Sequence, residues 1–99
     1  MYHPISLIRL DDEGEAVETT PLHAVQVNNK AGSESYDDGA GQYHLTLVFR
    51  VAWSHKLEAM RYRPMHYHIV YQGQTFRVVG YDDYMERHLW VDITAVAYG

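Results

Sequence analysis

Two histidines and two aspartates are the residues of this chain best suited to chemistry. His66 and His68 are separated by one residue, and Asp82 and Asp83 are adjacent. Imidazole nitrogens bind metals and exchange protons near neutral pH, and carboxylates act as general acids and bases. These groups form a site only if the surrounding elements bring them together.

The histidine pair suggests a metal site. On one strand, His66 and His68 would point the same way, about 6 to 7 Å apart. A cupin-type site adds a following glutamate and a distant histidine, but residues 69–72 contain no glutamate. His88 is the candidate third ligand of this alternative function, a small cupin-like metal-binding enzyme. The competing interpretation places both histidines on an outer face beside Arg77, whose charge disfavours a bound cation.

The aspartate pair and the remaining motifs give little support to catalysis. Adjacent side chains on an extended chain point apart, and no EF-hand spacing surrounds Asp82 and Asp83. A turn in which aspartate binds backbone N–H groups is the more common use of such a pair. No Gly-x-Ser-x-Gly elbow, phosphate loop or dinucleotide fingerprint occurs. We therefore predict a protein that is not an enzyme and has no cofactor or metal.

One long strand is predicted over residues 42–53. Six apolar residues share one parity, so a strand would place all of them on one face, whereas a helix would scatter them. They are Tyr43, Leu45, Leu47, Phe49, Val51 and Trp53.

A hairpin is predicted around Gln72 and Gly73. Glycine supplies the positive φ of a two-residue turn, and this turn sets Val70 opposite Thr75, Ile69 opposite Phe76, Tyr67 opposite Val78 and His68 opposite Arg77. The turn and the apolar pattern select the same register.

The other elements are less regular. Residues 3–10 and 22–27 are predicted strands, with a turn at Asp12 and Gly14. Residues 82–87 form a turn before the last strand, whose inner face holds Leu89, Val91, Ile93 and Ala95. Residues 54–60 form a short helix that Ser54 caps and that ends by Pro64.

These elements predict a mainly β fold. We expect a small antiparallel β-barrel of about five or six strands, formed by residues 1–99 as a single domain. It has one short helix and a long flexible loop at about residues 28–42, which is an unusual length unless the loop is functional or disordered.

Composition limits the function further. The chain has 8 basic and 13 acidic residues and a net charge of −5, which disfavours a role in gripping nucleic acid. It has no cysteine, which suits a reducing compartment. We expect neither a signal peptide nor a membrane span. Nine tyrosines are many for a small core and indicate contact surfaces.

The order of features resembles a known family. A short first strand, an Ala-x-Val strand, a polar loop and a long alternating strand lead to Tyr-x-Ile-x-Tyr-x-Gly-x-x-Phe-x-Val and an acid. This order is similar to that of the head–tail joining proteins of tailed bacteriophages, also called head-completion, stopper or connector proteins. The framework residues are Tyr67, Ile69, Tyr71, Gly73, Phe76, Val78 and Asp82.

The resemblance implies a structural virion protein of the head–tail connector. Such a protein forms a ring with other copies of itself under the portal, joins head to tail and helps to retain packaged DNA. Its partners would be a portal or adaptor protein above and a tail-completion or tail protein below. Double-stranded DNA would pass without sequence-specific binding. Its location would be the virion, and the host cytoplasm during assembly.

Within this interpretation, the polar loop is the candidate channel or interface segment. Copies of it would project into the channel, where their acids repel phosphate. The residues are Ser33, Glu34, Ser35, Tyr36, Asp37 and Asp38. The competing interpretation is a solvated crossover with no partner.

A third interpretation is an OB-type module for single-stranded nucleic acid. Tyr67, Tyr71 and Phe76 would be its stacking platform. Such a module needs a basic groove, and this region offers only Arg61, Arg63 and Arg77.

Overall fold

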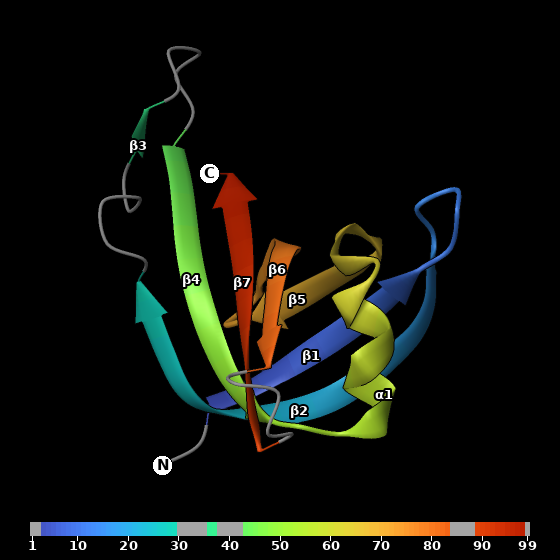
Figure 1. Cartoon of the computed structure of the whole chain (residues 1–99). Coiled ribbons are helices and arrows are strands. Elements are labelled where there is room, and N and C mark those ends of the chain that lie inside the picture. Colours follow the sequence, from blue (N-terminus) through green and yellow to red (C-terminus); the bar gives the residue numbers. More distant parts are fainter. Residues whose placement is uncertain (1–2, 30–35, 38–42, 84–88, 99) are drawn as a thin grey trace.

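The computed structural model describes residues 3–29, 36–37, 43–83 and 89–98, most of which lie in antiparallel strands (Figure 1). A helical segment joins β4 to β5 and consists of α1 (His55–Glu58), η1 (Ala59–Arg61) and η2 (Pro64–His66). The strands are β1 (His3–Leu10), β2 (Ala16–Asn29), β3 (Tyr36–Asp37), β4 (Tyr43–Ala52), β5 (Tyr67–Tyr71), β6 (Gln74–Asp83) and β7 (Trp90–Tyr98).

Six of these strands close into a barrel. Their order is β2-β1-β5-β6-β7-β4, and β4 pairs back with β2 from Ala24↔Val51 to Asn29↔Leu47. The short β3 extends the sheet beside the start of β4. Among the described residues, the part of β2 before Ala24 pairs with β1 alone, so its outer edge lies beyond the closed part of the barrel. The prediction of a small antiparallel barrel with one short helix is confirmed.

The core fills the inside of this barrel and receives side chains from β1, β2, β4, β5, β6 and β7. The predicted long strand is β4, and its inward residues Leu47, Phe49 and Val51 are buried. The other fully covered strand residues include Ile5, Leu7, Ala24, Ile69, Phe76, Val78, Val91, Ile93, Ala95 and Ala97.

The predicted hairpin is confirmed with its register. Ile69 pairs with Phe76 and His68 with Arg77. Gln72 and Gly73 both have positive φ, 53° and 79°, as a two-residue turn between twisted strands requires.

The N-terminal hairpin differs from its prediction. The second strand begins at Ala16 rather than Leu22, so residues 16–21 are strand and not loop. Asp11 rather than Asp12 organises the turn, because its Oδ1 accepts hydrogen bonds from the backbone N–H groups of Glu13 and Glu15, both at 2.9 Å. Gly14 has the expected positive φ of 83°.

A β-bulge interrupts β6. Its pairing with β7 shifts between Val78↔Ala95 and Gly80↔Thr94, which adds one residue to β6. The extra residue reverses the alternation of faces: Phe76 and Val78 point inward before it, and Tyr81 and Asp83 point inward after it. Asp82 faces outward as a strand residue, so the predicted turn at Asp82 and Asp83 is wrong.

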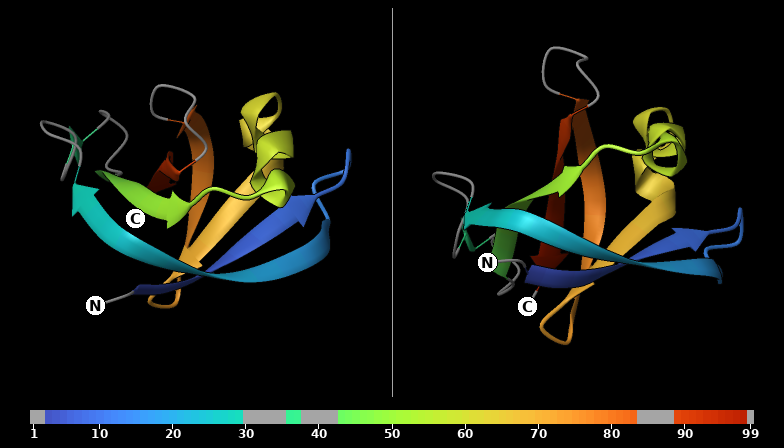
Figure 2. Two further views of the ribbon diagram at one scale, coloured as in Figure 1. Left: turned by 60° about the horizontal axis from the view of Figure 1, so that its bottom comes forward. Right: turned by 90° about the horizontal axis from the view of Figure 1, so that it is seen from below.

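The two ends of the barrel are built differently. The helical segment lies across one end, next to the β1–β2 turn, and we call this the capped end (Figure 2). Leu57 and Met60 from this segment are buried, which closes the capped end. The opposite end has the β5–β6 turn and the starts of β1 and β4, and we call it the open end.

The predicted short helix is confirmed in part. α1 starts after Ser54, whose carbonyl oxygen, not its side chain, accepts a hydrogen bond from Leu57 N at 3.1 Å. Pro64 begins a further 3₁₀ turn. Leu89 precedes the last strand and is exposed, so its predicted inward position is wrong. None of the described helices has the length and apolar character needed to cross a membrane.

Candidate interaction surfaces

The histidines do not form the predicted arrangement. His66 lies in η2, so it does not share a strand with His68. His68 faces outward opposite Arg77, and partial burial together with the Arg77 charge lowers its pKa. His88 lies outside the described residues. Within residues 3–29, 36–37, 43–83 and 89–98, no three His, Asp or Glu side chains are grouped to hold a metal ion.

The two aspartates lie in different surroundings. Asp82 is exposed and pairs across the sheet with Asp92, a like charge on the same outer face. Asp83 is buried and its Oδ2 lies 3.4 Å from Nη2 of Arg61. As consecutive strand residues the two carboxylates point to opposite faces of β6, so they form no acid–base pair.

A polar network at the capped end is the densest cluster of charged contacts that the structure describes. Glu58 is its centre: its Oε2 accepts hydrogen bonds from Trp53 Nε1 at 2.7 Å and from Tyr81 Oη at 3.2 Å. Arg61 bridges Glu58 and Asp83, with its Nε 3.3 Å from Glu58 Oε1, and lies over the Tyr81 ring. The network ties the helical segment to the ends of β4 and β6.

The electrostatics of this network follow from those contacts. The hydrogen bond from Trp53 and those from Arg61 and Tyr81 lower the pKa of Glu58, because all of them favour its charged form. Burial and the nearby Glu58 carboxylate raise the pKa of Tyr81 to about 12. Glu58 therefore stays ionised and Tyr81 neutral at physiological pH, which suits a structural contact.

A second set of contacts fixes the β1–β2 hairpin against the helix. The Glu18 carboxylate lies between two basic groups: its Oε2 is 3.0 Å from Lys56 Nζ, and its Oε1 is 3.3 Å from Arg9 Nε. These bonds lower the pKa of Glu18, and the groups involved are well exposed. Ion pairs of this kind contribute little to stability but set the position of the hairpin.

The open end holds a hollow instead of a cap. It has a volume of about 350 Å³. Its floor is aromatic, since Tyr71 packs edge-on against Phe49 at 5.4 Å and Phe49 against Phe76 at 5.8 Å. The lining residues are His3, Val27, Leu45, Leu47, Tyr71, Gln72, Gln74 and Phe76.

The predicted stacking platform for nucleic acid does not form. Tyr67 and Phe76 are buried inside the barrel, so their faces are covered by other side chains. Tyr71 is partly buried and packs against the core. Stacking with bases needs exposed ring faces, and the third interpretation is therefore wrong on geometry.

The predicted channel loop is described only at two residues. Tyr36 and Asp37 form β3, where Tyr36 pairs with His44 and Asp37 with Tyr43. This position extends β4 beyond its pairing with β2, at the open end. Ser33, Glu34, Ser35 and Asp38 lie outside the described residues.

The framework residues of the hairpin are mostly interior. Gly73 makes the turn and Asp82 lies on the outer face of β6. The buried members are Tyr67, Ile69, Phe76 and Val78, and Tyr71 is partly buried.

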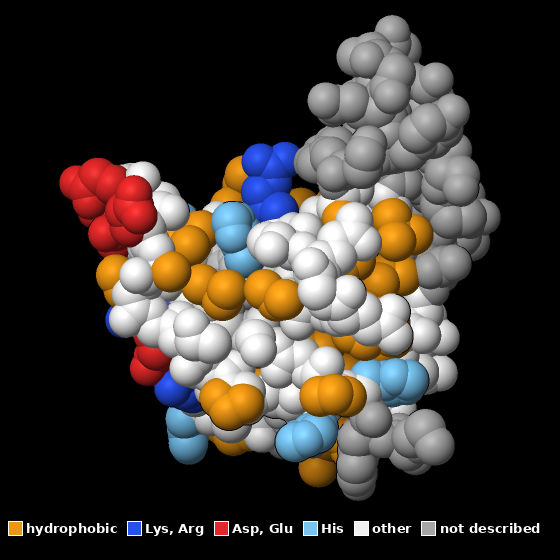
Figure 3. Space-filling model, turned by 180° about the vertical axis from the view of Figure 1, so that it is seen from behind, with side chains coloured by type: hydrophobic (Ala, Val, Ile, Leu, Met, Phe, Trp, Pro, Cys, Tyr) orange, Lys and Arg blue, Asp and Glu red, His pale blue; other side chains and the backbone are white. Residues whose placement is uncertain are grey.

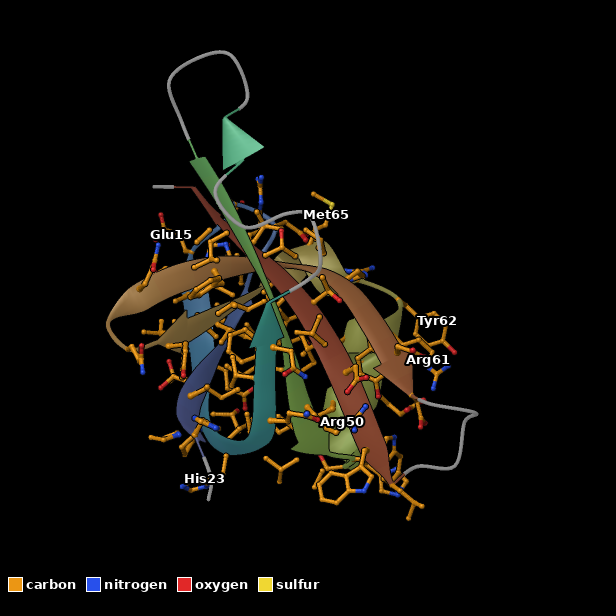
Figure 4. The ribbon with its side chains drawn as sticks, turned by 90° about the vertical axis from the view of Figure 1, so that its left-hand side faces the viewer. Glu15, His23, Arg50, Arg61, Tyr62 and Met65 are labelled. Atoms are coloured by element: carbon orange, nitrogen blue, oxygen red, sulfur yellow. The ribbon has the colours of Figure 1, made fainter. Side chains whose placement is uncertain are left out.

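Several large apolar side chains are exposed, among them those of Tyr62, Met65 and Trp90. Tyr62 is 80% exposed and Met65 62%, both next to the helical segment's end. Trp90 is 45% exposed at the start of β7. In Figure 4, Met65 lies near the top and Tyr62 at the right. His23, which lines a hollow together with Trp90, lies at the lower left.

Trp90 borders a hollow of about 580 Å³. The hollow opens where the pairing of β2 with β4 ends at Ala24↔Val51 and the two strands diverge. Pro21, Leu22, His23, Val25, Val51 and Ala52 form the rest of its lining. Trp90 alternates with the inward Val91 and so lies on the outer face, but the sequence carries no signal for the hollow or for the network around Glu58.

A family model described as "Phage head completion protein" matches residues 10–97. A chain from the solved structure titled "Virion of native gene transfer agent (GTA) particle" has a similar fold, with a TM-score of 0.60 and 14% sequence identity. That similarity covers 99% of this chain and 92% of the other. The search of curated proteins gave no match.

Proposed function

The chain belongs to the phage head completion protein family, and on this premise we propose that it forms a ring under the portal that joins head to tail. As a family member it is a structural, head-related protein of the phage particle. The proposed neighbours are a portal or adaptor protein above and a tail-completion or tail protein below. Assembly takes place in the host cytoplasm, and the protein's final location is the virion.

The observation that carries the proposal is the family match over residues 10–97, which spans β2 to β7 and the helical segment. The surface supports a role in binding rather than catalysis. Exposed side chains such as Tyr62, Met65 and Trp90 are types that anchor protein interfaces. Glu58 and Asp83 are engaged in structural contacts with Arg61.

The proposal includes retention of packaged DNA. The net charge of −5 favours passage of DNA without adhesion, because like charges repel. We assign the lumen to the segment Ser33, Glu34, Ser35, Tyr36, Asp37 and Asp38, whose acids would line the passage in every copy. The pairing of β3 with β4 supports this assignment because it anchors the middle of the segment at the open end.

The test is a phage lacking this protein, with the full chain supplied from a plasmid as the control. We expect filled heads separated from tails in electron micrographs, and packaged DNA that becomes sensitive to added DNase. The plasmid should restore joined, DNase-resistant particles. Joined particles that keep their DNA without the protein would contradict the proposal.

A second experiment isolates the loop. Deletion of residues 31–40 is expected to leave head–tail joining intact and to reduce DNA retention. A control variant with Glu34→Gln, Asp37→Asn and Asp38→Asn keeps the length and removes the charge. Unchanged retention in the deletion variant would make the segment a solvated crossover and leave the joining role standing.

A further inference from the structure

The outer edge of β2 is unpaired in the first part of the strand. Among the described strands, residues 16–23 pair with β1 alone, and pairing with β4 begins only at Ala24↔Val51. An unpaired strand edge presents backbone N–H and C=O groups that can pair with another chain. Only an extended backbone can pair with these groups in series, so the edge selects an extended peptide segment.

Pro21 shows which backbone groups face this edge. Proline has no N–H, and a sheet tolerates it where its nitrogen faces away from the paired strand. Pro21 lies opposite Ser6 of β1, so its backbone groups face the outer edge. Backbone groups of an antiparallel strand alternate between its two sides. Thr19, two residues earlier in the same register, therefore directs both its N–H and its C=O outward.

An apolar hollow lies at one end of this edge. It has a volume of about 580 Å³ and opens where β2 and β4 diverge. Leu22 and Val51 contribute to its lining, and so does the ring of Trp90, which is 45% exposed. A strand added to residues 16–23 would place one of its ends here, and a large apolar side chain at that end would be removed from water.

Acidic side chains lie at the other end of the edge. Asp12, Glu13 and Glu15 are exposed in and beside the β1–β2 turn, and none of them has an ion pair with another residue that the structure describes. Glu18 differs from them because it already has two basic partners. Figure 3 shows acidic side chains gathered at one projecting corner of the molecule. These acids favour basic residues at this end of an added strand.

We propose that the outer edge of β2 binds an extended segment of a neighbouring protein of the particle, which pairs with residues 16–23 as an added strand. The inference rests on the proposed function, which supplies that neighbour. Antiparallel pairing is the more frequent kind, and it sets the start of the segment at the hollow and its end at the acidic turn. A large apolar residue of the segment therefore precedes a lysine or arginine by about seven residues, the separation of Leu22 from Glu15.

Thr19→Pro tests the edge, because it removes the outward backbone N–H. Thr19→Val is the matched control, since it keeps this N–H and the shape of the side chain. The probes are purified tails and purified heads from a phage lacking this protein, each mixed with the full chain and sedimented. We expect the natural chain and Thr19→Val to bind one of the two probes, and Thr19→Pro to bind it about tenfold more weakly.

Two further variants leave the backbone of β2 unchanged, so they test the proposal even if Thr19→Pro fails to fold. Trp90→Ala removes part of the hollow, and Glu13→Lys/Glu15→Lys reverses the charge at the other end. Each should weaken binding to the same probe by about tenfold. Full binding by both variants would overturn the assignment of the two ends.

Photo-crosslinking identifies the bound segment. A photoreactive benzoylphenylalanine replaces Val17, whose side chain is 48% exposed, and assembled particles are illuminated before mass spectrometry of the adduct. We expect a segment of a different protein, with a large apolar residue followed about seven residues later by a lysine or arginine. An adduct whose corresponding end is acidic would overturn the proposal.

The remaining outcomes separate this inference from the proposed function. Equal binding by Thr19→Pro and Thr19→Val, with native thermal unfolding of both, would overturn the edge and leave head–tail joining standing. An oligomer of the isolated natural chain that dissociates in Thr19→Pro would assign the edge to a second copy and overturn the proposed occupant. Binding of the natural chain to neither heads nor tails would overturn the proposed function, and this inference with it.

Discussion

The two ends of the barrel close by different means. At the capped end, buried Leu57 and Met60 enter the barrel, and Glu58 and Arg61 tie their helix to β4 and β6. At the open end, partly buried Leu45 and Tyr71 border a hollow, and a two-residue turn joins the strands. Buried side chains and charged contacts therefore close the capped end, whereas the open end keeps a hollow bordered by partly buried side chains. Truncation of an inward residue at the capped end should reduce stability more than truncation of one at the open end.

The largest effect is expected from Leu57→Ala at the capped end. Leu57 is 1% exposed, and truncation leaves a cavity, so the free energy of unfolding should fall by about 2–5 kcal/mol. Leu45→Ala at the open end should cost clearly less, because that side chain is only partly buried. Urea unfolding measures both, with Leu89→Ala as the exposed control. Equal losses at Leu57 and Leu45 would abolish the contrast between the ends.

Asp83→Ala should have the next largest effect. Its carboxylate is fully covered and faces Arg61, so the variant leaves the guanidinium with Glu58 as its remaining described carboxylate partner. Loss of a charged hydrogen bond predicts a decrease of about 1–3 kcal/mol in the free energy of unfolding. Asp82→Ala is the matched control, because the Asp82 side chain is exposed and lies opposite another acid, Asp92. A larger decrease in the free energy of unfolding for Asp82→Ala than for Asp83→Ala would show that the exposed acid, not the buried one, stabilises the capped end.

Acid should weaken the capped end through Glu58. The folded pKa of Glu58 lies below its ordinary value of 4.5, so its contribution is complete above that pH and declines as pH falls through the folded pKa. Unfolding measured between pH 6 and pH 3, about 1.5 units either side of that value, should show a steeper loss of stability for the natural chain than for Glu58→Gln. Parallel curves for the two proteins would mean that the network contributes no proton-linked stability.

The smallest effect is expected at the open end's turn. Gln72 has a φ of 53°, a region that asparagine enters more readily than glutamine. Gln72→Asn should raise the free energy of unfolding by about 0.5 kcal/mol. Gly73→Ala should lower it by about 1 kcal/mol from backbone strain alone, because an added Cβ meets no atom within 4 Å. A destabilising Gln72→Asn would assign the glutamine side chain a role in this turn.

Local alternation was enough to predict the strands whose side chains follow one rule from end to end. The predictions of the β5–β6 hairpin, β4 and most of β7 were correct, because alternate burial of side chains is a property of the strand itself. The start of β2 was missed because Glu18, Thr19 and Pro21 resemble a loop in composition, although they lie in a hairpin beyond the closed part of the barrel.

The polar network could not be predicted from spacing. Arg61 meets Asp83 across 22 residues, and Tyr81 meets Glu58 across 23, so only the fold brings them together. The aspartates were assigned to a turn because adjacent acids are common in turns, whereas both lie in β6. The bulge at Val79 and Gly80 places Asp82 outside and Asp83 inside, which is the reverse of regular alternation from Val78.

That bulge takes up one residue of chain without moving the strands around it. Removal of Val79 would leave Val78 opposite Ala95 and Gly80 opposite Thr94, and regular alternation would then keep Tyr81 and Asp83 inward. A relative that is one residue shorter here can therefore keep the buried carboxylate that faces Arg61 in its place.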